Sequence, residues 1–209
     1  MKTETSQKIN KSILRKELRE RRKQLREPER LALDISINHH LAKFMSEQRF
    51  STIAAFWPFD GEPDLLPALK EADQNGTQIL LPVISQTSAG PSLIFRQWSA
   101  ETEMKKNRFG IPEPGGGNEL LLSDIDLLLM PLVGWDEAGN RLGMGMGFYD
   151  RALQTLSHSE VPIRVGVAYR LQKAQEIPIE PWDIPLHMVL SEIGWINCPS
   201  SSHKREFHE

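Results

Sequence analysis

The residues with the clearest chemical potential form a glycine-rich segment in the second half of the chain. Residues 126–151 read DLLLMPLVGWDEAGNRLGMGMGFYDR, in which Gly143, Gly145 and Gly147 stand at every second position. Glycines let backbone N–H groups approach a ligand because no Cβ stands in the way. Arg141 adds a fixed positive charge where this loop begins. The segment therefore predicts a cradle for phosphate groups.

Asp150 follows the glycines, in a helix predicted from about Gly147 to Leu156. A helix N-terminus favours an anion through its free N–H groups and its dipole, and a carboxylate beside it could hold Mg²⁺ against phosphates. However, the GxGxG spacing is neither a P-loop nor the full GxGxxG dinucleotide pattern. The alternative is a tight strand-to-helix connection in which Asp150 is simply an acid favoured by the dipole. The glycine spacing alone does not decide between these interpretations.

The hydrophobic pattern predicts a parallel sheet that would position this loop. Ser51–Trp57 and Gln78–Val83 are short apolar runs typical of buried strands, and Leu65–Gln74 between them is typical of a helix. Strand, helix and strand at this spacing require a right-handed crossover and parallel pairing. The sheet is therefore expected to bind its ligand at the carboxyl ends of its strands.

Four more strands and one long loop are predicted after this unit. The strands are Ser92–Trp98, Ile125–Met130, Ile163–Ala168 and, last, His187–Ser191. Phe109–Asn118 holds two prolines and four glycines and is predicted to be a loop throughout. The fold class is thus α/β, with an open, mostly parallel Rossmann-like sheet flanked by helices.

Two helices are predicted before the first strand and would form a helical N-terminal arm. Residues from about Gln7 to Arg26 contain no Gly or Pro, and Ile9, Ile13, Leu14, Leu18 and Leu25 fall roughly on one stripe of a helix. Pro28 can open a second helix that runs to about Glu47. Its Leu31, Ile35 and Leu41 are expected to point inward.

The composition predicts one soluble, cytoplasmic domain. The chain has 209 residues, no apolar run of membrane-spanning length and a polar N-terminus without a secretory signal. Its single cysteine, Cys198, excludes an internal disulfide and a cysteine-rich zinc site. The domain is predicted over residues 1–198, and residues 199–209 are predicted to be a disordered tail.

The charge is concentrated at the N-terminus. Residues 1–30 hold 11 of the 25 Lys and Arg but only 5 of the 28 Asp and Glu. A basic arm can indicate nucleic acid, but this one lacks interleaved aromatic residues and any nucleic-acid motif. Most of its charges are expected to form the solvated face of a helix, although one or two could reach an anionic ligand.

The string NRLGMGMGFYDR at residues 140–151 closely resembles the signature of the 5-formyltetrahydrofolate cyclo-ligases, also called 5,10-methenyltetrahydrofolate synthetases. The resemblance covers nearly the whole chain, from the basic helix to the PWDIP segment around Asp183. Two positions depart from the usual pattern. Met146 stands where many bacterial members have glycine, and Phe148 where tyrosine is common. We expect altered pocket contacts rather than lost activity.

The resemblance implies an ATP- and Mg²⁺-dependent enzyme that closes 5-formyltetrahydrofolate to 5,10-methenyltetrahydrofolate and releases ADP and phosphate. The formyl oxygen would attack the γ-phosphate, N10 would add to the activated carbon, and phosphate would depart. This chemistry needs no serine, cysteine or histidine nucleophile. The implied enzyme is a monomer with a small-molecule substrate, with or without a polyglutamate tail, and has no nucleic-acid or membrane partner.

The resemblance also implies a role for individual residues. Arg141, Tyr149 and Lys11 match catalytic positions, and Asp150 and Asp183 match magnesium ligands. The ATP-binding positions are Lys11, Arg15, Arg141, Leu142, Gly143, Met144, Gly145, Met146, Gly147, Phe148 and Tyr149. The substrate-binding positions are Trp57, Glu62, Phe109, Met144, Gly145, Gly147 and Phe148.

Taken alone, several of these residues have simpler interpretations. Lys11 and Arg15 share one helix face at i, i+4 spacing, but they could be two solvated charges. Glu62 and Asp183 could be ordinary turn acids, and Trp57 could be a buried strand end. Two other functions also remain open: a different anion-binding enzyme on a similar sheet, such as a sugar-phosphate isomerase or acyl-CoA transferase, and a non-catalytic folate-binding protein.

Overall fold

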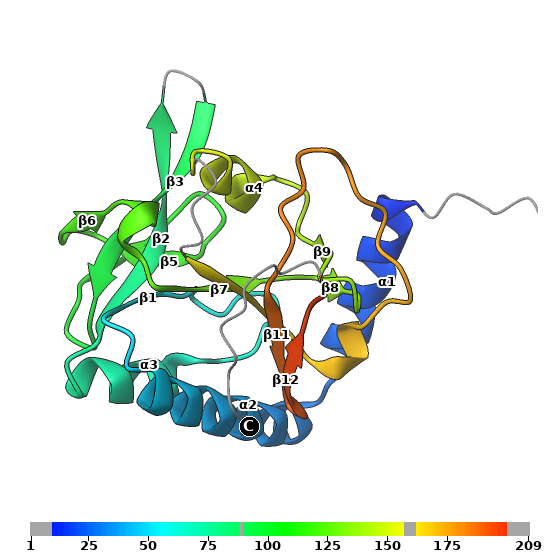
Figure 1. Cartoon of the computed structure of the whole chain (residues 1–209), viewed down its shortest axis with the longest axis horizontal. Coiled ribbons are helices and arrows are strands. Elements are labelled where there is room, and N and C mark those ends of the chain that lie inside the picture. The colour runs from blue at the N-terminus through cyan, green and yellow to red at the C-terminus, as the bar shows by residue number, and fades with distance from the viewer. Residues whose placement is uncertain (1–9, 88–89, 157–161, 200–209) are drawn as a thin grey trace, which may run out of the picture.

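The computed structural model describes residues 10–87, 90–156 and 162–199. Within these ranges, eight strands form one sheet in the order β12-β11-β10-β7-β1-β2-β3-β6 (Figure 1). The strands are β1 (Thr52–Ala54), β2 (Gln78–Thr87), β3 (Gly90–Trp98), β6 (Glu119–Leu120), β7 (Leu127–Pro131), β10 (Ile163–Val167), β11 (Met188–Ser191) and β12 (Gly194–Asn197). The helices are α1 (Lys11–Lys23), α2 (Glu27–Gln48), α3 (Leu66–Gln74) and α4 (Phe148–Leu153).

The central strands run parallel, as predicted. β1 pairs in parallel with β2 and β7, and β10 pairs in parallel with β7 and β11. Ile53 of β1 is fully buried between its partners Ile79 and Leu127, which is typical of a strand covered on both faces. The outer strands β3, β6 and β12 pair antiparallel. The prediction of an open, mostly parallel α/β sheet is confirmed.

Strand β12 was not predicted, so the expectation that His187–Ser191 forms the last strand is wrong. Gly194, with φ of 107°, lets the chain turn back directly after β11. β12 then pairs antiparallel with β11 from Ser191↔Gly194 to Met188↔Asn197. Residues 200–209, most of the predicted tail, lie outside the described residues.

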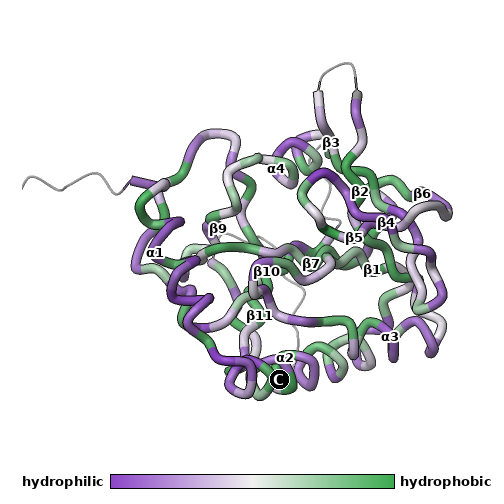
Figure 2. The backbone as a smooth tube through the Cα atoms, turned by 180° about the vertical axis from the view of Figure 1, so that it is seen from behind, coloured by the Kyte–Doolittle hydropathy of each residue, from purple (hydrophilic) through white to green (hydrophobic). Residues whose placement is uncertain are grey.

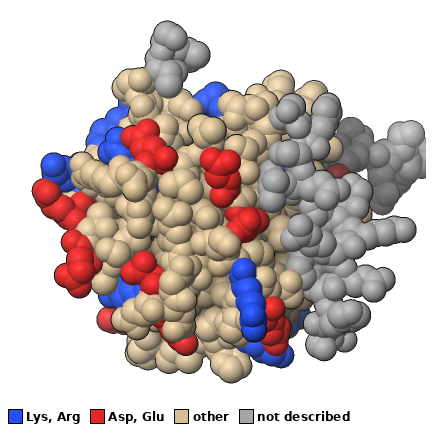
Figure 3. Space-filling model, turned by 60° about the vertical axis from the view of Figure 1, so that its left-hand side comes forward, with Lys and Arg blue, Asp and Glu red and all other residues tan. Residues whose placement is uncertain are grey.

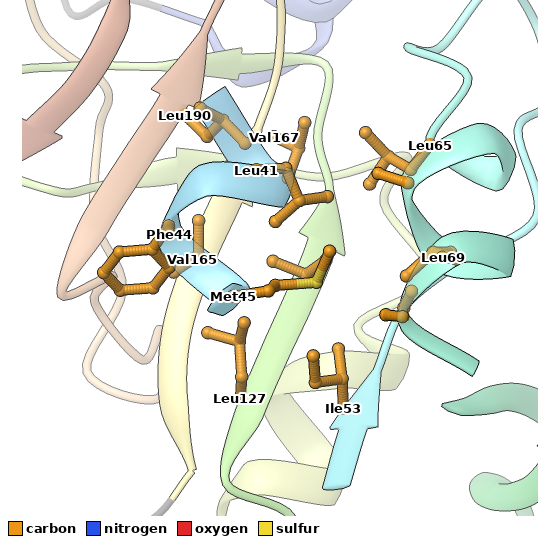
Figure 4. Packing of buried hydrophobic residues seen from close by; sticks show 14 of the residues in the cluster. Leu41, Phe44, Met45, Ile53, Leu65, Leu69, Leu127, Val165, Val167 and Leu190 are labelled. Carbon is orange, nitrogen blue, oxygen red and sulfur yellow. The ribbon is translucent and has the colours of Figure 1, made fainter. Parts of the chain in front are cut away.

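Helices α2 and α3 cover one face of the sheet. Figure 4 shows side chains from both helices and from β1, β7, β10 and β11 pointing toward one another. Burying each of these large aliphatic or aromatic side chains stabilises the fold by about 1.5–3 kcal/mol. This hydrophobic cluster includes Leu41, Phe44, Met45, Ile53, Leu65, Leu69, Leu127, Val165, Val167 and Leu190.

The inward face of α2 differs from the prediction. Leu41 is buried, but Leu31 and Ile35 are 60% and 63% exposed. The buried stripe instead begins at Asp34, whose carboxylate accepts a hydrogen bond from the buried Tyr169 hydroxyl at 2.7 Å. It continues through Ile37, Leu41, Phe44 and Met45. That stripe carries more apolar residues than the one through Leu31 and Ile35, so it packs against the sheet.

The predicted loop Phe109–Asn118 contains a strand, which corrects that prediction. β5 (Pro112–Pro114) pairs antiparallel with β4 (Met104–Lys106). The prolines lack N–H donors, but Glu113 between them pairs with Lys105, and Asn107 N donates to Ile111 O at the turn. The glycine and proline content therefore marks a short two-stranded ribbon rather than an irregular loop.

Helix α1 lies at one side of the molecule, against the end of the sheet (Figure 1). Its described part begins at Lys11, after the cap Asn10, and residues 1–9 lie outside the described range. Leu18 is 1% exposed and packs with Val133, Leu142 and Ile177. In Figure 2 much of α1 is hydrophilic, whereas β1 and β7 are hydrophobic. The amphipathic helix predicted here is therefore anchored by one apolar side.

Acidic and basic residues are interspersed on the face in Figure 3, and neither sign gathers there into a large patch. Among the described residues, no helix is both long and apolar enough to cross a membrane.

Candidate active site

A cavity of about 1000 Å³ lies at the carboxyl ends of the parallel strands. Its wall includes Trp57, which follows β1, and Pro131, which ends β7. This is the edge where an open parallel sheet is expected to bind its ligand. All sixteen residues predicted from the sequence line this one cavity: Lys11, Arg15, Trp57, Glu62, Phe109, Arg141, Leu142, Gly143, Met144, Gly145, Met146, Gly147, Phe148, Tyr149, Asp150 and Asp183.

The glycine-rich loop connects β9 (Arg141–Leu142) to α4 and forms one wall of the cavity. Gly145 and Gly147 have φ of 97° and 63°, which residues with a Cβ rarely adopt. The loop geometry therefore requires glycine at these two positions. Helix α4 ends at Leu153, earlier than the predicted Leu156, and has only six residues.

The neighbours of these glycines expose their side chains to the cavity. Met144 and Met146 are 41% and 47% exposed and both line it. Arg151 stabilises the loop. Its Nη1 donates to Met146 O at 2.8 Å, and its guanidinium lies over the Phe148 ring.

Helix α1 brings two cations into the cavity. Lys11 Nζ donates to Asp183 Oδ2 at 2.7 Å, and Arg15 Nε donates to Gly143 O at 2.8 Å. Their i, i+4 spacing puts both on one face of the helix, as predicted. Each contacts a segment that lies more than a hundred residues further along the chain. The helical arm is therefore part of the site and not only a solvated surface.

The two predicted metal ligands belong to neighbouring segments of the cavity wall. Asp150 forms an ion pair with Arg141, and its Oδ1 also accepts from Ile184 N at 3.3 Å. Ile184 directly follows Asp183, whose Oδ2 accepts from Glu180 N at 2.9 Å. The structure thus brings both carboxylates, from segments 33 residues apart, to one wall.

This donor set fits magnesium rather than a metal held by protein ligands alone. The described residues contain no group of three or more His, Cys, Asp or Glu that could hold a metal ion. Mg²⁺ is usually bound by one or two carboxylates together with substrate phosphates. Asp150 and Asp183 provide such a pair, and Lys11 and Arg141 stand beside them.

Arg141 has unused hydrogen-bonding capacity. Its side chain is 6% exposed, and its Nε is buried without a hydrogen-bond partner among the described residues. Burial lowers the pKa of this guanidinium, although the charge of Asp150 opposes that effect. A buried donor without a partner costs about 1–3 kcal/mol, which an anionic ligand could recover.

Glu62 is the most strongly perturbed acid of the cavity. Its Oε2 accepts from Phe59 N at 3.1 Å, and Arg22 Nη1 lies 3.8 Å from its Oε1. Burial raises its pKa to about 7, although the charge of Arg22 acts in the opposite direction. Burial also raises the pKa of the Tyr149 hydroxyl, and the charge of Glu62 raises it further. The pKa of each group is therefore set by burial and by neighbouring charges rather than by contact with solvent.

Arg22 was missed by the sequence prediction, which assigned most charges of the arm to a solvated face. Its side chain is fully buried. Nε donates to Asp60 O at 3.1 Å, Nη2 to Asp60 Oδ2 at 3.0 Å, and Nη1 to Leu132 O at 3.2 Å. Asp60 has a left-handed backbone, with φ of 54°, and leads directly into Glu62. Arg22 follows the buried Leu18 by four residues, and that spacing was the available signal.

Much of the cavity wall is apolar. Trp57 and Phe109 belong to it, and Phe109 is 42% exposed. Several further residues of the wall lacked any recognisable motif in the sequence. They are Phe56, Phe59, Pro82, Ile84, Leu93, Asn107, Ile111, Pro112 and Glu113.

Comparison with known proteins agrees with this geometry. A model of the 5-formyltetrahydrofolate cyclo-ligase family matches residues 7–192. The 5-formyltetrahydrofolate cyclo-ligase of Haemophilus influenzae is 35% identical over 179 residues, which cover 85% of this chain and 95% of that protein. The Escherichia coli (strain K12) protein of the same name is 42% identical over 142 residues, which cover 67% of this chain and 77% of that protein.

Two solved structures share the fold. The 5,10-methenyltetrahydrofolate synthetase of Aquifex aeolicus has a TM-score of 0.78 and 29% identity, and the comparison covers 96% of this chain and all of that one. The corresponding enzyme of Mycoplasma pneumoniae has a TM-score of 0.73 and 26% identity, covering 88% and 99%. With a family match over most of its length, the chain belongs to the 5-formyltetrahydrofolate cyclo-ligase family.

Proposed function

We propose that this protein is a cytoplasmic, monomeric enzyme that uses ATP and Mg²⁺ to close 5-formyltetrahydrofolate to 5,10-methenyltetrahydrofolate. The observation that carries the proposal is one cavity whose wall combines cations and two carboxylates with aromatic and aliphatic side chains. The charged groups suit a nucleoside triphosphate, and the apolar groups suit a flat heterocycle. The similarity to a 5-formyltetrahydrofolate cyclo-ligase and to a 5,10-methenyltetrahydrofolate synthetase supports this reaction.

The reaction must turn an amide oxygen into a leaving group. The formyl oxygen attacks the γ-phosphorus, the bond to ADP breaks, and the formyl carbon becomes an iminium-type centre that carries a phosphate. N10 then adds to that carbon and loses its proton, and phosphate leaves as the ring closes. The protein has to align the two substrates and neutralise the charge on the transferring phosphoryl group.

The charged residues of the cavity are suited to the phosphates. Lys11, Arg15 and Arg141 supply positive charge, and the buried Nε of Arg141 is a donor that has no partner in the described part of the chain. Asp150 and Asp183 would hold Mg²⁺, which when bound supplies charge neutralisation on the phosphate oxygens. The glycine-rich loop lets backbone N–H groups approach the same oxygens.

Glu62 is suited to the reacting end of the folate. It is buried in the cavity wall beside Tyr149, and Arg22 fixes the turn that carries it. A carboxylate at this position would stabilise the positive charge that develops when the formyl oxygen is phosphorylated. Trp57 and Phe109 would contact the apolar part of the ring system.

The first test is absorbance in the methenyl-folate band after mixing the protein with 5-formyltetrahydrofolate, ATP and Mg²⁺. We expect a rise that requires ATP. Folate binding without ATP consumption would instead indicate a non-catalytic folate-binding protein. Absence of both folate binding and product would refute the proposal and favour another anion-binding enzyme.

Replacing Lys11 by alanine is expected to raise the KM for ATP about tenfold or more, because one charge-assisted hydrogen bond to a phosphate is lost. The KM for the folate should change little. Initial rates at varied ATP would measure this. Lys16→Ala is the matched control, because Lys16 lies on the same helix but is exposed and outside the cavity. An equal KM for ATP in both variants would mean that Lys11 does not bind ATP and belongs to the solvated face of the helix.

A further inference from the structure

Glu113 stands out among the acids of the cavity because it is half-buried and yet has no cationic partner among the described residues; Glu180, which has none there either, is exposed. Asp150 pairs with Arg141, Asp183 with Lys11, and Glu62 lies beside Arg22. Glu113 lies on β5, half-buried in the cavity wall. A half-buried carboxylate without a cation needs hydrogen-bond donors to offset its desolvation.

Part of that requirement is met by the protein. Glu113 Oε1 accepts from Ile84 N at 3.0 Å and from Asn107 Nδ2 at 2.7 Å. A carboxylate has about four acceptor positions, two on each oxygen. Oε2 makes no hydrogen bond to the part of the chain that the structure describes. One oxygen therefore fixes the side chain, and the other is free for a ligand.

The surroundings define the shape of that ligand. Ile84, Leu93 and Ile111 line the cavity near the carboxylate, and the aromatic rings of Trp57 and Phe109 line it as well. Pro112 and Pro114 flank Glu113 and stiffen the strand that carries it. Apolar walls with one fixed acceptor are suited to a flat heterocycle that has N–H donors on one edge.

We propose that Glu113 is a specificity-determining residue that reads the donor edge of the pterin ring, with Oε2 accepting from the 2-amino group and the adjacent N3–H. This inference rests on the proposed function. The 2-amino-4-oxo pattern of a pterin puts two donors side by side. Adenine instead offers one amino donor beside the acceptor N1, which a carboxylate would repel. Glu113 therefore favours the folate over the nucleotide as its partner.

The test is Glu113→Gln. Glutamine keeps an oxygen that can accept from Ile84 N and Asn107, so the contact between β2 and β5 is preserved. Its NH₂ group would face the donors of the pterin. We expect the KM for 5-formyltetrahydrofolate to rise roughly tenfold to a hundredfold, as for a lost hydrogen bond to a charged group. The kcat and the KM for ATP should change little.

Glu103→Gln is the matched control, because Glu103 precedes β4 and its side chain is 79% exposed. A second measurement uses an analogue of the substrate with methyl in place of the 2-amino group. The wild type should strongly prefer the natural substrate, and Glu113→Gln should lose most of that preference. A purely structural role of Glu113 would not change this ratio.

Three results would overturn the inference: an unchanged folate KM, a rise in the KM for ATP instead, or equal discrimination against the analogue by both enzymes. Tryptophan fluorescence can follow folate binding without ATP. If the wild type forms no methenyl product, the proposed function fails, and the binding titrations of the two variants still decide the role of Glu113.

Discussion

Asp150→Asn is expected to lower kcat/KM by roughly a hundredfold to a thousandfold, an effect of the size seen when one electrostatic contact to a transition state is removed. Asparagine keeps the shape of the side chain but loses the charge that would hold Mg²⁺ against the phosphates. The required Mg²⁺ concentration should rise as well. Initial rates at saturating ATP and varied Mg²⁺ measure both effects.

The ion pair with Arg141 complicates this variant, and a stability measurement resolves it. Arg141 is nearly buried, so loss of its partner is expected to cost about 3 kcal/mol of unfolding free energy. Denaturant unfolding would show how much protein remains folded under assay conditions. Asp124→Asn is a suitable control, because Asp124 is exposed and lies outside the cavity. If the variant keeps near-normal turnover and the Mg²⁺ requirement of the wild type, Asp150 is not a magnesium ligand.

The parallel centre of the fold could be predicted because its signals are local. Ser51–Trp57, Gln78–Val83 and Ile125–Met130 are short apolar runs bounded by turn residues, and strands buried on both faces have this composition. Once they are parallel, their carboxyl ends must meet at one edge. The position of the cavity follows from that topology, and the family motif identified which loops would line it.

Other features depend on contacts between distant segments, which a single sequence does not reveal. Apart from its spacing from Leu18, Arg22 looks like any other charge of the basic arm, and its burial is decided by Asp60 and Leu132, far along the chain. Glu113 lies in a segment whose prolines and glycines pointed to a loop. It becomes a candidate for folate binding only because β5 pairs with β4 and the Glu113 carboxylate accepts a hydrogen bond from Ile84 N of β2.

Glu62→Gln is expected to have opposite effects on activity and stability. The variant should lose roughly a hundredfold or more in kcat/KM, because the carboxylate no longer stabilises positive charge on the formyl carbon. In the wild type, kcat/KM should rise with pH through about 7, the pKa to which burial raises Glu62. That rise should be absent in the variant. Arg19, Arg22, Asp60 and Tyr149 are the charged or titratable groups that act on this carboxyl group.

The stability effect follows from the direction of the same shift. The ordinary pKa of 4.5 applies when the chain is unfolded, whereas the folded protein holds the Glu62 proton up to about pH 7. The folded state therefore binds more protons between these values, and the contribution of Glu62 to stability falls as pH rises from about 4.5 to about 7. Above pH 7 that cost is constant, at about 3 kcal/mol. Glutamine does not ionise, so it removes the cost.

Unfolding of wild type and Glu62→Gln should be compared at pH 5 and pH 8. We expect the variant to gain about 2–3 kcal/mol relative to wild type between the two values. Glu20→Gln, at an exposed site on α1, should show no such gain. A variant that is equally destabilised at both pH values would mean that Glu62 is ionised throughout and held by Arg22. In that case burial does not govern this carboxyl group, and the rise of activity with pH must come from another residue.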